Sequence, residues 1–281
     1  MPLCRSFTLL GAVLLPLLSG VAQAYTSATA SASANEYSLL CGTCSIDFQD
    51  LGSDADGGPG AAEAHAQLSG GGYAGVGGAS FAGPDALPEL TAYAFAEMIP
   101  PGTDLRTYFY EVTGSASAIQ QYTYLGAGPE TYTIEYTLDG EFALSAADAA
   151  SLMSIYGGVT VYGSPFVPGA EVNPTLDFDY QGESASAIGT APFSLTGSVE
   201  FTVSPGDIVY VAANLFATAD SSHEVSGSVD ALHTLSLAFT SGNPSLLTPE
   251  ATAVPEPGTA TLLLVGSAIL GAARHRRRAA V

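Results

Sequence analysis

Alternating apolar and polar positions dominate the middle of the chain. In residues 131–138, TYTIEYTL, tyrosine, isoleucine and leucine take every second position, and threonine and glutamate take the others. Residues 198–203, SVEFTV, repeat the pattern with Val199, Phe201 and Val203. Because neighbouring side chains of a strand point to opposite faces, this period of two predicts strands with one buried face. Similar runs predict strands within residues 92–98 and 105–112.

Turn residues separate these runs. Ser204-Pro205-Gly206-Asp207 is a predicted turn, since proline fixes φ and glycine accepts positive φ. Residues 207–216 are expected to return as the second strand of a hairpin, and residues 225–239 to form a long alternating pair of strands. Several short strands with turns between them indicate an all-β fold, an antiparallel β-sandwich or jelly-roll-like body over residues 25–240.

Three segments depart from this pattern. Residues 144–158, LSAADAASLMSIYGG, carry a capping-box pattern and end in two glycines, so a short helix competes with a strand and a turn. Residues 52–83 are rich in Gly and Ala and are expected to be loop, with one weak strand near 64–69. Residues 241–253, which include Pro244 and Pro249, are expected to be a spacer.

The charge is one-sided, with 27 Asp and Glu against six Arg and no Lys. Between residues 25 and 254, Arg106 is the one Lys or Arg. Such a body repels phosphate backbones, which excludes nucleic acid as a partner. Charged residues make up 12% of the chain, against about 25% in an average domain. A surface made of Ser, Thr, Gly and Tyr favours an extracellular β protein over a cytosolic enzyme.

The N-terminus has the three parts of a secretory signal peptide, residues 1–24. Arg5 supplies the positive charge, residues 7–18 form the apolar region, and Ala22-Gln23-Ala24 is a small-x-small cleavage site. The signal implies export by the Sec machinery and cleavage by signal peptidase, so that the mature chain begins at Tyr25.

The C-terminus, residues 254–281, also has three parts in a fixed order. A short proline motif is followed by an apolar run over residues 259–273, a predicted transmembrane helix, and then by a basic cluster. The motif consists of Val254, Pro255, Glu256 and Pro257, and the cluster of Arg274, Arg276, Arg277 and Arg278. Arginines hold their end of a helix in the cytoplasm. Both termini therefore predict a body outside the membrane.

This tail resembles the PEP-CTERM sorting signal of Gram-negative bacteria. The resemblance implies recognition by an exosortase, transient residence in the inner membrane, cleavage near the motif, and delivery to the cell surface or the exopolysaccharide matrix. The small residues Gly258, Thr259 and Ala260 fit the pattern. The alternative is a plain C-terminal anchor in which the PEP sequence is a coincidence.

Cys41 and Cys44, in CGTC, remain after the signal peptide leaves with Cys4. The oxidising compartment favours a disulfide between them. A redox-active pair is disfavoured, because no Lys, Arg or His lies nearby in sequence to lower a thiol pKa. A zinc site would need two further ligands, and His65 is a lone candidate.

Residues 52–63, GSDADGGPGAAE, have the spacing of a twelve-residue calcium loop. Asp54 and Asp56 take the third and fifth positions, Gly57 the sixth, and Glu63 the twelfth. Gly52 stands where Asp is expected, and no incoming helix is evident. Calcium binding and a solvated acidic turn both fit these residues.

No spacing in the chain indicates catalysis. The G-x-S-x-G elbow is absent, and His223-Glu224 lacks the second histidine of a zinc-protease helix. The sequence therefore predicts an exported structural or matrix protein without catalytic residues or a cofactor other than calcium. A carbohydrate-binding module is the alternative, supported by 14 Tyr and opposed by the absence of Trp. Of the three functions considered, a secreted hydrolase is the least favoured by the sequence.

Overall fold

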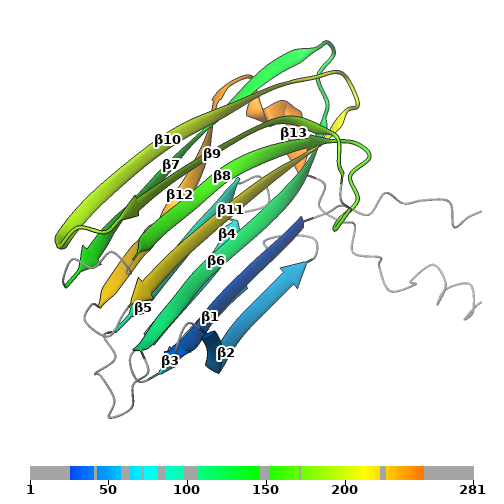
Figure 1. Cartoon of the computed structure of the whole chain (residues 1–281). Helices are drawn as coiled ribbons and strands as arrows, with labels where there is room; N and C mark the ends of the chain where they lie inside the picture. The colour runs from blue at the N-terminus through cyan, green and yellow to red at the C-terminus, as the bar shows by residue number, and fades with distance from the viewer. Residues whose placement is uncertain are drawn as a thin grey trace, which may run out of the picture. The chain divides into compact units, whose positions relative to one another are not determined.

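The computed structural model describes residues 26–40, 43–57, 64–70, 73–81, 87–97, 107–145, 152–170, 172–221 and 226–249. These residues form two antiparallel sheets stacked face to face, so the predicted β-sandwich is confirmed (Figure 1). Sheet A contains, in spatial order, β2 (Thr43–Gly57), β1 (Thr26–Leu40), β6 (Thr107–Tyr124), β11 (Ile208–Ser221), β8 (Met153–Gly163) and β9 (Thr175–Ala185). Sheet B contains β10 (Gly189–Val203), β7 (Glu130–Leu144), β12 (Gly227–Ser241), β5 (Pro88–Ala96), β4 (Tyr73–Phe81) and β3 (Ala64–Gly70).

Large side chains fill one part of the interior. The four apolar residues that alternate in β7, from Tyr132 to Leu138, are at most 1% exposed, as the pattern predicts. Val199, Phe201 and Val203 of β10 are buried beside them. Tyr132 lies directly opposite Phe201, and the two rings stack with centroids 5.7 Å apart. Burial of these side chains holds this part of the sandwich together.

Small residues fill the other part of the interior. Every second residue of β1 from Ala28 to Ala34 is a buried alanine, and the same holds for β5 from Ala92 to Ala96. A Cβ added at Gly77 of β4 would overlap the carbonyl oxygen of Ser115, and one at Gly114 of β6 would overlap those of two sheet B residues. The backbones of the two sheets therefore touch here, and only glycine fits at the contact.

The weak strand expected near residues 64–69 is confirmed as β3, but the loop predicted for residues 52–57 and 73–81 is wrong, and the close approach of the sheets explains why. Strand β2 continues to Gly57, and β3 and β4 occupy much of the remainder. Gly and Ala are poor strand formers because they offer little surface to pack. Here the facing sheet is near enough for these small residues to bury well, which the composition alone does not reveal.

Two predicted connections are also wrong. The turn at residues 204–207 forms, with Gly206 at φ 86°, but β11 pairs with β6 and β8 in sheet A, whereas β10 pairs with β7 in sheet B. The turn therefore crosses between sheets and does not close a hairpin. The strand pair expected at residues 225–239 is a single strand, β12, whose register with β5 shifts between Ala231 and Leu235.

The two remaining segments contain strands in their described parts. Residues 153–158, for which a helix competed, belong to β8, while residues 146–151 lie outside the described ranges. In the segment expected to be a spacer, residues 244–246 form one 3-10 turn and β13 (Leu247–Pro249) pairs with β6. Leu247 is buried, so this part of the segment packs on the sandwich.

Aspartates on β9 cover the open edge of sheet B. Asp177 Oδ2 accepts a hydrogen bond from the backbone N–H of Glu200 at 2.7 Å, and Asp179 Oδ2 accepts one from Ser198 at 3.1 Å. The Tyr136 hydroxyl also donates to Asp179 Oδ2, at 3.0 Å. Burial and this bond to a carboxylate raise the pKa of Tyr136 above its ordinary value. The backbone N–H groups of Ser198 and Glu200, at the edge of sheet B, therefore have acceptors within the protein itself.

The opposite edge is closed in the same way. Asp54 of β2 accepts a hydrogen bond from the backbone N–H of His65 on β3, at 2.9 Å. Asp54, Asp177 and Asp179 are here called the edge aspartates. Each lies on an edge strand of sheet A at a position whose register partner is buried (Ala30, Val161 and Val159). An inward-pointing charge also disfavours pairing with a further strand.

Replacing Gly114 with Ala tests the contact between the sheets. We expect the free energy of unfolding to fall by about 3 kcal/mol, because the new Cβ forces the sheets apart. Gly128→Ala is the matched control, since no heavy atom lies within 4 Å of its added Cβ. Urea denaturation measures both, and equal stabilities would contradict the close approach.

Replacing both Asp177 and Asp179 with Ala tests the closure of the β10 edge. We expect a loss of about 2 kcal/mol, because two backbone N–H groups and the Tyr136 hydroxyl lose charged acceptors. The freed edge should also promote self-association, visible by sedimentation. Glu200→Ala, the control, removes an exposed carboxylate on β10 and should neither lower stability nor promote self-association. A double variant as stable and monomeric as this control would show that the two aspartates do not protect the β10 edge.

Candidate functional site

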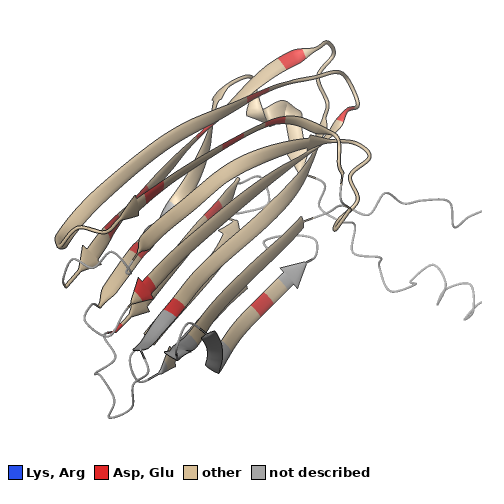
Figure 2. Cartoon of the chain, in the orientation of Figure 1, with Lys and Arg blue, Asp and Glu red and all other residues tan. Residues whose placement is uncertain are grey.

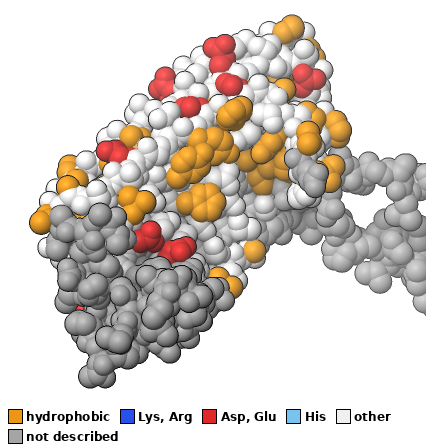
Figure 3. Space-filling model, in the orientation of Figure 1, with side chains coloured by type: hydrophobic (Ala, Val, Ile, Leu, Met, Phe, Trp, Pro, Cys, Tyr) orange, Lys and Arg blue, Asp and Glu red, His pale blue; other side chains and the backbone are white. Residues whose placement is uncertain are grey.

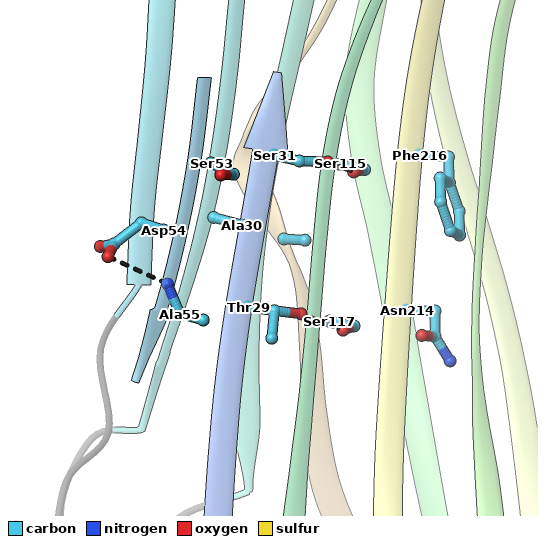
Figure 4. Close-up of a pocket in the computed structure, with 11 residues that line it drawn as sticks. Thr29, Ala30, Ser31, Ser53, Asp54, Ala55, Ser115, Ser117, Asn214 and Phe216 are labelled. Carbon is cyan, nitrogen blue, oxygen red and sulfur yellow. Dashed lines mark hydrogen bonds between the residues drawn. The ribbon is translucent and has the colours of Figure 1, made fainter. Parts of the chain in front are cut away.

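Side chains on the outer face of sheet A align in rows across the strands (Figure 4). The register places the first row at Ser53, Ser31, Ser115, Phe216 and Tyr156, from β2 to β8. The second row contains Ala55, Thr29, Ser117, Asn214, Gly158 and Tyr180, from β2 to β9. Hydroxyl groups therefore gather over β1 and β6, and aromatic rings over β8, β9 and β11.

A groove of about 380 Å³ runs over the hydroxyl-bearing part of these rows. Its floor is tied together by cross-strand hydroxyl pairs, Thr29 with Ser117 and Ser31 with Ser115, each 2.6 Å between oxygens. Asn214 and Phe216 also line the groove, from β11 (Figure 4). Because the strands hold every one of these side chains, the groove has a fixed lining in which hydroxyl and amide groups alternate with apolar groups.

Two tyrosines form a stacked pair beside the groove, here called the tyrosine platform. The rings of Tyr156 and Tyr180 are almost parallel, at 5° with centroids 5.4 Å apart. Each ring lies over the glycine opposite it on the other strand: a Cβ at Gly158 would overlap the ring of Tyr180, and one at Gly182 would come within 3.0 Å of Tyr156. The Tyr180 hydroxyl pairs with Thr160 Oγ1 at 2.7 Å. The pair is therefore positioned before any ligand arrives.

The aromatic surface is open to solvent. Phe216 is 44% exposed, Tyr156 48% and Phe178 63%. Figure 3 shows hydrophobic side chains gathered on this face, over β8, β9 and β11. None of the described residues is Lys or Arg, whereas Asp and Glu are spread over both sheets (Figure 2). An exposed apolar patch of this kind marks an interaction surface, and the charge around it disfavours an anionic partner.

Farther along the same face, a carboxyl pair lies in a poorly solvated position. Asp220 of β11 is opposite Glu111 of β6, which is in turn opposite Asn35 of β1. Asp220 Oδ1 and Asn35 Oδ1 are buried without a hydrogen-bond partner in the described part of the chain. Burial, and then the charge of Glu111, raise the pKa of Asp220 to about 6.

Most of the residues predicted as sites lie outside the described ranges. These include the signal peptide, Cys41, Glu63, the predicted transmembrane helix, and the motif and basic cluster of the tail. Within the described ranges, no helix is long and apolar enough to cross a membrane. Cys44 lies in β2, opposite Leu39 of β1. The disulfide between Cys41 and Cys44 stays a prediction.

The candidate calcium loop at residues 52–63 is described only as far as residue 57, and calcium binding there stays untested. Residues 52–57 belong to strand β2, whereas a calcium loop turns sharply at its sixth position. The Asp54 carboxylate accepts hydrogen bonds from the backbone N–H groups of Ala55 and His65, each at 2.9 Å. Asp56 lies in the same strand. Among the described residues, no group of three or more His, Cys, Asp or Glu could hold a metal ion.

Sequence reasoning missed the groove and the tyrosine platform. The alternation of Ser or Thr with Ala in residues 26–34 and 113–118 is the one signal that could have indicated a hydroxyl-bearing face. The platform depends on the pairing of β8 with β9, which places Tyr156 opposite Gly182. Cross-strand register is not readable from local sequence, so these residues could not be grouped in advance.

Comparison with known proteins confirms the resemblance seen in the tail. Residues 253–278 match the PEP-CTERM protein-sorting motif. The chain is therefore similar, over these residues, to exported proteins sorted through that motif. A search among curated proteins finds no significant match.

Several solved structures show weak similarity to the chain. The carbohydrate-binding module TmCBM61, solved with β-1,4-galactotriose, is 13% identical with a TM-score of 0.16, over 48% of this chain and 72% of that one. A carbohydrate-binding module of the β-sandwich superfamily is 9% identical with a TM-score of 0.20, over 73% and 84%. The VP2 subviral particle of infectious bursal disease virus is 13% identical with a TM-score of 0.11, over 90% and 74%. These TM-scores are too low for any ligand or role to be inferred.

The carboxyl pair on sheet A leads to a pH-dependent prediction. The pKa of Asp220 is raised on folding, so its charged form is disfavoured in the folded state and stability falls as pH rises from about 4 to about 6. Asp220→Asn should therefore be more stable than the natural chain at pH 7.5, by about 1 kcal/mol after allowance for solvent screening, and equally stable at pH 4.

Urea denaturation at the two pH values measures this difference. Glu183→Gln, which alters an exposed carboxylate on β9, should leave the stability unchanged at both. A variant at Asp220 that is less stable at pH 7.5 would show that the carboxylate is favourably paired, contrary to this assignment.

Proposed function

We propose that this chain is sorted by an exosortase and retained at the cell surface or in the exopolysaccharide matrix, where it acts without catalysing a reaction. The single observation that carries the proposal is the PEP-CTERM motif at residues 253–278. That motif indicates export and sorting to the envelope of a Gram-negative bacterium. The signal peptide predicted at residues 1–24 supports the same route.

The groove supports a role without catalysis. Its serine and threonine hydroxyls pair with one another, and the described residues that line it include no histidine to activate a serine. The closed sheet edges and the acidic surface suit a protein that stays folded and dispersed outside the cell. These features fit a structural or binding component of a matrix.

Carbohydrate binding is a second candidate function, favoured by the platform of Tyr156 and Tyr180. Sugar rings have apolar C–H faces that pack on aromatic rings, and tyrosine combines such a face with a polar tip. The two rings are parallel and partly exposed, beside a groove lined by hydroxyl and amide groups. This arrangement fits a noncatalytic matrix protein that holds polysaccharide.

Replacing Glu256 with Gln tests the sorting step. We expect protein released from the cell surface to lack the apolar run and the arginines, because an exosortase has cleaved near the motif. With Glu256→Gln the full-length chain should accumulate in the inner membrane, since the anchor is intact but the motif is altered. Fractionation and intact-mass spectrometry measure both outcomes.

Glu250→Gln is the matched control, because Glu250 precedes the matched residues 253–278. It should be processed like the natural chain. Surface protein that still ends at Val281 would show that the tail is a plain anchor and would contradict the sorting proposal.

A further inference from the structure

We infer that the outer face of sheet A binds a neutral polysaccharide chain, with Tyr156 and Tyr180 packing against sugar rings and the groove residues Thr29, Ser117 and Asn214 bonding to sugar hydroxyls. This inference rests on the second candidate function above and assigns its site and ligand class. The hydroxyl rows, the groove and the platform belong to one continuous face, since Phe216 of the groove lies directly opposite Tyr156 of the platform.

The platform is built for stacking at low entropic cost. Each tyrosine ring rests on a cross-strand glycine, and the Tyr180 hydroxyl is tied to Thr160. Side chains that are already fixed lose little freedom when a ligand binds, which raises affinity. Phe178, 63% exposed and 6.3 Å from Tyr180 between ring centroids, extends the aromatic surface.

The groove supplies the polar half of the site. Asn214 carries both donors and an acceptor, and each hydroxyl can donate or accept, so the lining matches the mixed donors and acceptors of a sugar. The second row runs from Tyr180 on β9 to Thr29 on β1. With neighbouring strands about 4.8 Å apart, this path is about 19 Å long, enough for several sugar units of one chain.

The negative charge of the chain favours neutral polysaccharides over anionic ones. None of the described residues is Lys or Arg, and the whole chain has a formal net charge of −21. An anionic polysaccharide or nucleic acid would be repelled, and it would find no Lys or Arg to bind among the described residues. A protein partner would have to cover a floor of hydroxyl groups, whereas a neutral sugar chain offers hydroxyls along its whole length.

Affinity gel electrophoresis of protein purified from the cell surface tests the inference. The neutral probes are dextran, galactan and hydroxyethylcellulose, and the anionic probe is alginate. We expect at least one neutral probe to retard the protein and alginate not to. Tyr156→Ala and Tyr180→Ala should each weaken binding at least about tenfold, because each removes half of the platform.

Matched variants separate binding from folding. Leu125→Ala, which removes an exposed side chain outside this face, should bind like the natural chain. Asn214→Ala, a small change in the groove, should weaken binding several-fold even if an alanine at Tyr156 or Tyr180 unfolds the chain. Thermal unfolding followed by circular dichroism checks each variant.

Three results would overturn the inference. These are no retardation by any neutral probe, equal binding by the natural chain and the folded alanine variants, or a dimer in sedimentation that Tyr156→Ala dissociates. The last result would make this face an interface between copies. The sorting proposal is tested separately, since unprocessed surface protein that still binds dextran or galactan would refute sorting alone.

Discussion

The contact between the two sheet backbones at Gly77 and Gly114 is the constraint on which the rest of the structure depends. Where backbones touch, inward positions can hold only glycine or alanine, and β1 accordingly alternates buried alanines with serine and threonine. The outward positions then carry almost all the side-chain chemistry of these strands. The hydroxyl rows on the outer face of sheet A are thus the counterpart of a thin, small-residue interior.

The acidic composition has a structural use in this arrangement. The sandwich has open sides, and the edge aspartates place carboxylates on backbone N–H groups there. Edge protection by inward-pointing charge needs no basic partner, which is consistent with a body almost free of Lys and Arg. Asp220 is a different case, because its buried carboxylate faces Glu111 and is stabilised by protonation.

The sequence was informative where large apolar residues alternate with polar ones, and where a short contiguous motif indicates function. Strands β7 and β10 were predictable because large apolar residues, such as Tyr132 and Phe201, occupy every second position in each strand. The sorting tail was recognisable because its three parts are contiguous in the sequence. Strand β4 was not, since glycine and alanine bury well only against a facing backbone. The partner of β11 and the platform of Tyr156 and Tyr180 depend on pairing between distant segments, which local patterns do not encode.

The proposed binding surface of this sandwich is the outer face of sheet A. Backbone chemical-shift mapping by NMR, on protein titrated with the neutral polysaccharide that retards it most, tests this claim most directly. The account predicts shifts confined to the outer face of sheet A, strongest around Tyr156, Tyr180 and Phe216 on β8, β9 and β11, and reaching Thr29 and Ser117 on β1 and β6. Shifts centred on the outer strands of sheet B, or no shifts at saturating polysaccharide, would contradict it.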